Sequence, residues 1–151
     1  MSTIIYSIRL NINRFVFILT TLLILSPTIV VSQSSGMKWS DDGISYYILS
    51  GNQIIKYTLP DNQPSVLVSP DKLMSETGEK PLSVSYFSIN EKSGKVLLMS
   101  DSKKVWRLNT RGDFHILDLN TGKLTRLGKE LPPSSLMFAK LSPDGKYAAY
   151  V

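Results

Sequence analysis

The chain has 151 residues, of which 42% are hydrophobic and 19% charged, which excludes a disordered tail and suits about one folded domain. Its net charge of +5 comes from scattered Lys and Arg residues, so the sequence lacks the basic patch of a nucleic-acid-binding protein. It has no cysteine and a single histidine, His115, which excludes a disulfide framework, a thiol nucleophile and a multi-histidine metal centre. No bound metal or cofactor is predicted.

Residues 1 to 32 are predicted to be a secretory signal peptide. Arg9 and Arg14 precede an uncharged apolar run from Phe15 to Val31, and the small Ser32 places the cleavage before Gln33. An uncleaved membrane anchor is the alternative, because a run of this length lies at the short limit for crossing a bilayer. The mature protein is therefore expected to be secreted or periplasmic, or membrane-anchored if the leader is retained.

The remainder, residues 33 to 151, contains a repeated turn. Gly43, Gly94 and Gly145 end polar turn segments at two equal spacings of 51 residues, and each is followed by a short run with strand character. Gly122 is predicted to hold the left-handed position of a further hairpin. Hairpins that repeat every 40 to 50 residues are typical of propeller blades, each a four-stranded sheet. A β-sandwich with a coincidental spacing is the alternative.

The predicted fold is therefore all-β, a partial β-propeller of about two blades with the opening of a third. Outside the leader, the segment from Ser69 to Gly78 comes nearest to a helix, and Pro70 limits it to a short turn. Since propellers close with four to eight blades, the chain is expected to be the first part of a longer protein.

The two predicted blades differ within residues 103 to 113. The strands after Gly43 and Gly94 align at an offset of 51, whereas Ile54 aligns with Phe114 at an offset of 60, so the second blade has about nine additional residues. Insertions on a rigid scaffold often carry binding groups, because loops tolerate added residues while the sheet holds them in place. The candidate binding residues of this insertion are Lys103, Lys104, Trp106, Arg107 and Arg111.

No combination of nucleophile, base and oxyanion hole is predicted in the chain. His115 alternates with the apolar Phe114 and Ile116, and no serine is placed beside it. We expect it to be a surface or interblade hydrogen-bonding residue without a catalytic role.

Two segments resemble a known peptidase group. Residues 138 to 151, with Ser142-Pro143-Asp144-Gly145 at their centre, resemble the blade motif of prolyl-oligopeptidase-type peptidases and of TolB-like proteins. Lys104-Val105-Trp106-Arg107, followed without a gap by Phe114 to Asn120, is similar to the second-blade segment of dipeptidyl peptidase IV and its bacterial relatives. The likeness covers about Met37 to Val151.

The resemblance implies an eight-bladed propeller that caps an α/β-hydrolase domain and a serine exopeptidase that releases N-terminal dipeptides with proline or alanine second. In that family the arginine that matches Arg107 holds a substrate carbonyl oxygen, with Trp106 beside it. The glutamates that bind the free amino terminus and the catalytic serine, aspartate and histidine would lie beyond Val151. This chain would then contribute substrate binding and gating, and it would be inactive alone.

The implied partner is a peptide with a free N-terminus, and the resemblance leaves open a homodimer of the full-length protein. Leu108-Asn109 stands where the family commonly has a polar His-Ser-like pair, so the hydrogen bonding around Arg107 is left open. A secreted or periplasmic TolB-like propeller that binds protein without catalysis is the alternative. A Gly-x-Ser-x-Gly elbow downstream would distinguish the peptidase from it.

Overall fold

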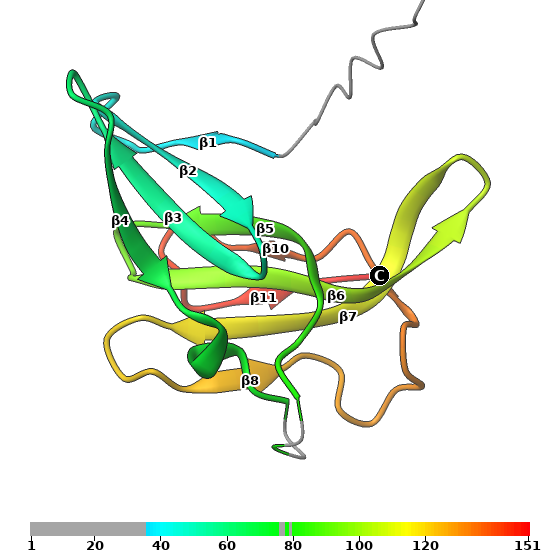
Figure 1. Cartoon of the computed structure of the whole chain (residues 1–151). Helices are drawn as coiled ribbons and strands as arrows, with labels where there is room; N and C mark the ends of the chain where they lie inside the picture. The colour runs from blue at the N-terminus through cyan, green and yellow to red at the C-terminus, as the bar shows by residue number, and fades with distance from the viewer. Residues whose placement is uncertain (1–35, 76–77, 79) are drawn as a thin grey trace, which may run out of the picture. The chain divides into compact units, whose positions relative to one another are not determined.

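The computed structural model describes residues 36–75, 78 and 80–151. The predicted leader, residues 1 to 32, and its cleavage site lie outside these described residues. The described chain consists of antiparallel β-strands and a 3-10 helix, η1 (Pro70–Leu73), within the segment predicted to hold a short helical turn (Figure 1). The all-β prediction is confirmed.

The first sheet is a four-stranded antiparallel meander whose spatial order follows the chain. Its strands are β1 (Lys38–Trp39), β2 (Ser45–Ser50), β3 (Gln53–Thr58) and β4 (Gln63–Val68). The β1–β2 turn places Gly43 at φ +70°, a backbone conformation that favours glycine, as the sequence predicted. Asp42 holds this turn by accepting hydrogen bonds from the Ser40 hydroxyl and the Ile44 amide, which lower the pKa of its carboxyl group.

The second sheet repeats this order. Its strands are β5 (Val84–Asn90), β6 (Lys95–Val105), β7 (Leu108–Asp118) and β8 (Leu124–Arg126), and β9 (Leu136–Met137) pairs with β7. Gly94 and Gly122 occupy left-handed turn positions at φ +62° and +70°. The third hairpin, β10 (Lys140–Leu141) and β11 (Ala148–Ala149), turns at Gly145.

The strand register differs from the spacing of the turn glycines. Corresponding strand pairs, each enclosing six residues, are Trp39 with Tyr46, Ile89 with Val96, and Leu141 with Ala148. Equivalent positions therefore lie 50 residues apart between the first two sheets, because the second turn has one more residue ahead of its glycine. The predicted offset of 51 is wrong by one residue in the strands, and such a shift exchanges the two faces of a strand.

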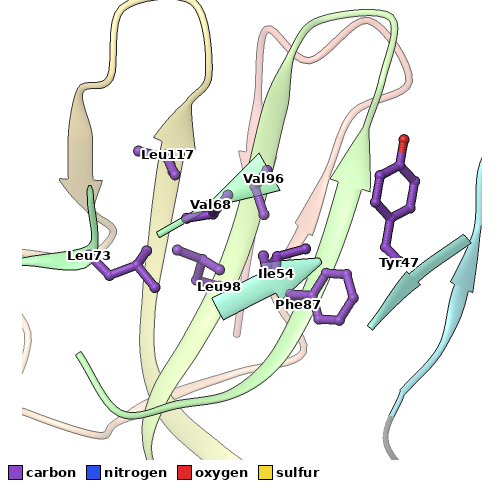
Figure 2. Packing of buried hydrophobic residues seen from close by; sticks show 8 residues of the cluster. All are labelled: Tyr47, Ile54, Val68, Leu73, Phe87, Val96, Leu98 and Leu117. Atoms are coloured by element: carbon purple, nitrogen blue, oxygen red, sulfur yellow. The ribbon is translucent and has the colours of Figure 1, made fainter. Parts of the chain in front are cut away.

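The second sheet is buried on both faces. One face contributes to a core cluster with the first sheet: Tyr47, Ile54, Val68, Leu73, Phe87, Val96, Leu98 and Leu117 (Figure 2). The other face packs against the third hairpin and the segment before it through Leu97, Met99, Phe114, Leu136 and Ala139. Successive residues of β6 thus point to opposite cores, which explains an uninterrupted apolar run in the sequence.

Polar contacts join the turns of successive sheets. The Glu91 carboxylate accepts hydrogen bonds from the Tyr47 hydroxyl (3.0 Å) and the Asp41 amide (3.2 Å). From the second sheet, Asn90 donates to the carbonyl oxygen of Ser142 (3.1 Å) and Lys95 donates to that of Gly145 (2.7 Å). The first and second turns are therefore each held by the turn that follows in the chain.

Candidate functional site

The central hairpin of the second sheet is longer than that of the first. Six residues lie between the paired Ile48 and Ile55, whereas sixteen lie between the equivalent pair Leu98 and His115. The second sheet thus has ten extra residues, against the nine expected, because the β2–β6 register is 50. They lengthen both strands, and β6 and β7 continue as a two-stranded hairpin beyond the sheet (Figure 1). We call residues 101–112 the arm.

Two irregularities mark where the arm leaves the sheet. The pairing shifts between Ser100 and Lys103, and again between Lys103 and Lys104. Asp101, inside the first shift, has a left-handed φ of +46°. Bulges of this kind bend a strand and increase its twist, which turns the arm away from the line of the sheet.

The arm ends in a two-residue turn formed by Trp106 and Arg107. Val105 pairs with Leu108 on either side of the turn, and Trp106 has φ +61°. The Trp106 side chain is 93% exposed, and Arg107 is exposed beside it. The structure therefore places both predicted binding residues together at the tip of the projecting hairpin, in a turn rather than along a strand.

The arm is positively charged. Its basic residues are Lys103, Lys104, Arg107 and Arg111, and Asp101 is acidic. The four basic residues are all exposed, so their charge is available to a ligand with carbonyl or carboxylate oxygens but is screened by salt.

The root of the arm borders a cavity of about 620 Å³. Asn109 and Thr110 from the arm line it, together with Tyr86 and Met99 from the second sheet and Phe138 from the segment before the third hairpin. Phe138 is 61% exposed, so this cavity presents an aromatic surface close to the arm.

The other sequence candidates lie elsewhere. His115 is buried, with 5% exposure, in the part of β7 that pairs with Leu98, so the surface alternative is wrong for this residue. Arg111 pairs with Met137 near the root of the arm and is not at the tip. Across residues 36–75, 78 and 80–151, no set of three acidic or histidine side chains could hold a metal ion. In the same residues no helix has the length and hydrophobicity needed to cross a membrane.

One group at the root of the arm was not predicted. Asp113 forms an ion pair with Arg126 at 2.9 Å and also accepts a hydrogen bond from the Ser134 amide at 2.9 Å. These partners lie 13 and 21 residues from Asp113 in the chain. No local sequence pattern links them, and only the docking of β8 and β9 beside β7 brings them together.

Comparisons with known proteins agree with this architecture. Residues 90–151 match the family model of the dipeptidyl peptidase IV (DPP IV) N-terminal region. The chain is also similar to the crystal structure of dipeptidyl peptidase 4 from Porphyromonas gingivalis, with a TM-score of 0.66 and 20% sequence identity. That likeness, which is one of fold, covers 78% of this chain and 16% of the other. No curated protein matches the chain in sequence. The resemblance to the DPP IV N-terminal region is confirmed.

Proposed function

We propose that this chain is the N-terminal propeller portion of an exported serine exopeptidase that releases X-Pro or X-Ala dipeptides, and that it contributes substrate binding and gating but no catalytic residue. The observation that carries the proposal is the arm: it lies within the residues that match the DPP IV N-terminal region, and it presents Trp106 and Arg107 at its tip. We call the longer protein the parent.

In this proposal the first and second sheets are two blades of an eight-bladed propeller, and β10 and β11 open the third. Both sheets have the same antiparallel strand order, which is that of a propeller blade. The second sheet packs between its neighbours through opposite faces, as a blade does. The number eight comes from the family resemblance.

The length of the arm supports a role at a distance from the sheet. Five extra residues on each strand, at about 3.3 Å per residue, extend the hairpin by roughly 16 Å. Arg107 is therefore the part of this sheet best able to reach a peptide bound between the propeller and a catalytic domain. A guanidinium group offers rigid, planar donors to a substrate carbonyl oxygen, and Trp106 adds an apolar surface beside it.

The test is the Arg107→Ala variant of the parent, assayed with a Gly-Pro or Ala-Pro reporter. Loss of a charge-assisted hydrogen bond of about 1.5 to 3 kcal/mol should lower kcat/KM by roughly ten- to a hundredfold. Arg107→Lys should recover only part of this loss, because an ammonium group cannot reproduce the planar fork.

Arg111→Ala is the matched control, since it removes an exposed cation of the same arm away from the tip. It should retain nearly full activity. Parent-like cleavage by Arg107→Ala, or an equal loss in Arg111→Ala, would contradict the role of Arg107. A parent that cleaves neither reporter would contradict the peptidase proposal itself.

Export is the second part of the proposal and rests on the basic start and apolar run of residues 1 to 32. N-terminal sequencing of the mature protein should begin near Gln33. A mature protein that retains Phe15 to Val31 would instead be membrane-anchored.

A further inference from the structure

The root of the arm is fastened by a polar group that links three strands. Asp113, one residue beyond the arm on β7, accepts a hydrogen bond at 2.9 Å from Nη2 of Arg126 on β8. The same carboxylate oxygen accepts one at 2.9 Å from the amide of Ser134, two residues before β9. The side chains of Asp113 and Arg126 are only 13% and 22% exposed.

Ser134 joins this group to the other strand of the arm. Its hydroxyl donates to the carbonyl oxygen of Asp101, the first arm residue on β6, at 3.0 Å. Ser134 is buried, with 6% exposure, and has a left-handed φ of +56°. One residue therefore contacts both strands at the point where they leave the sheet, through its amide on one side and its hydroxyl on the other.

The backbone packing at this point is equally close. Gly112 pairs with Leu136 of β9, and a Cβ atom at Gly112 would lie 2.8 Å from the carbonyl oxygen of Ser100. The arm thus has a three-stranded root but only two strands beyond it. A two-stranded ribbon is marginally stable by itself, so the direction of the arm depends on how its root is held.

The hydrogen bonds of Asp113 are of a kind that can hold the arm in one direction. An ionised carboxylate that accepts hydrogen bonds from a guanidinium and from a backbone amide forms directional, charge-assisted bonds. Apolar side chains at the same place would fill space without fixing the angle of the arm to the sheet. Buried ion pairs are known to specify geometry in some proteins, at the cost of desolvation.

We propose that Asp113, held by Arg126 and Ser134, is a positioning residue that fixes the direction of the arm and so the place of Arg107 at its tip. The effect on Arg107 rests on the proposed function. The fastening of the arm does not, and the two are tested separately.

The first experiment measures amide hydrogen exchange of the parent in the Asp113→Asn variant. Exchange in residues 101–112 should become at least about tenfold faster, as expected for local opening after loss of a charge-assisted bond. Ser134→Ala is a milder variant that removes only the hydroxyl bond to Asp101, and it should accelerate exchange in the same residues to a smaller extent.

Asp118→Asn is the matched control. Asp118 ends the same strand and accepts hydrogen bonds from the amides of Asn120 and Thr121, at 2.9 and 3.0 Å, in the turn far from the arm. It should leave exchange of residues 101–112 unchanged. Unchanged exchange of the arm in Asp113→Asn would overturn the proposal, whatever the result for Ser134→Ala.

The second experiment is a double-mutant cycle on kcat/KM. Asp113→Asn should lower kcat/KM between about threefold and a hundredfold when Arg107 is present, the usual range for coupled residues, and should have no further effect in the Arg107→Ala background. Equal losses in both backgrounds would overturn the positioning of Arg107 by Asp113 while the peptidase proposal stands. Arg107→Ala with parent-like activity would contradict the proposed role of Arg107 in substrate binding and leave the exchange result unaffected.

Discussion

The first and second sheets share a strand order but differ in the burial of their faces and in the length of their central hairpins. The second sheet is packed on both faces and carries the arm on its central hairpin, whereas in the first sheet that hairpin ends in a tight turn. The two sheets thus share one scaffold, and only the second carries an extension of it. Turns and strand pairing build the scaffold in both sheets, and the ten added residues, which carry the proposed binding group, are confined to one hairpin.

Side chains at equivalent positions of the two sheets differ in burial. Val96 and Leu98 of β6 are fully buried against the first sheet, while the equivalent Tyr46 and Ile48 of β2 are only half-buried. On this face of the first sheet, Tyr46 stacks on Tyr57 with ring centroids 5.2 Å apart. The rings of Trp39 and Tyr46 also meet edge to face, with centroids 5.6 Å apart. The first sheet thus carries aromatic cross-strand pairs on this face, and such pairs contribute to the stability of a sheet.

Truncating these equivalent positions should give the largest contrast in stability. Leu98→Ala removes a fully buried side chain and should lower the free energy of unfolding by about 2 to 5 kcal/mol. Ile48→Ala removes a half-buried one and should cost less than half as much. Urea denaturation followed by tryptophan fluorescence measures both, and equal losses would mean that the two faces are equally covered in solution.

A methyl group at the root of the arm should have the next largest effect. In Gly112→Ala the new Cβ would lie 2.8 Å from the Ser100 carbonyl oxygen and 2.9 Å from Cγ of Met99, and overpacking of this kind costs about 1 to 3 kcal/mol. Gly36→Ala, where a Cβ would meet nothing within 4 Å, should change stability by less than about 0.5 kcal/mol. Thermal unfolding of the two variants measures both changes in stability. An unchanged stability of Gly112→Ala would show that the root of the arm can widen.

The contact of Tyr47 with Glu91 should produce a smaller effect that depends on pH. Burial raises the pKa of Tyr47 to about 12, with the hydrogen bond to Glu91 as a further cause. The unfolded tyrosine ionises near its ordinary pKa of about 10, so the stabilising contribution is complete below pH 10 and is lost as the pH rises towards 12.

The Tyr47→Phe variant tests this contact between the sheets. At neutral pH it should cost about 0.5 to 1.5 kcal/mol, the value of one hydrogen bond. Between pH 10 and 12 the variant should lose less stability than the same protein with Tyr47. Urea denaturation at each pH measures both. A parallel decline of the two proteins would indicate that Tyr47 does not titrate differently in the folded state.

The parts of the fold that depend on local chemistry could be predicted from the sequence. Gly43, Gly94 and Gly145 take left-handed conformations in hairpin turns, and the strands follow them. The register could not be predicted, because it depends on where pairing starts beside each turn, and the glycine stands one residue later in the second turn than in the first.

The candidate site, too, could be predicted only in part from the sequence. The spacing between similar strands predicts the insertion and its Trp106-Arg107 pair, with nine added residues where the structure has ten. The fastening of Asp113 by Arg126 and Ser134 could not be found, since each bond joins residues that become neighbours only after the sheet has formed.

The contacts between successive turns fix the order of the repeats. Glu91 fits the Asp41 amide and the Tyr47 hydroxyl, whereas Asn90 and Lys95 fit the carbonyl oxygens of Ser142 and Gly145. The second turn thus carries two different sets of groups, one for each neighbour. A shuffled gene that exchanged the first and third segments would keep every hairpin intact, yet Glu91 would then face Pro143, which has no amide hydrogen, and Ala149, which has no hydroxyl.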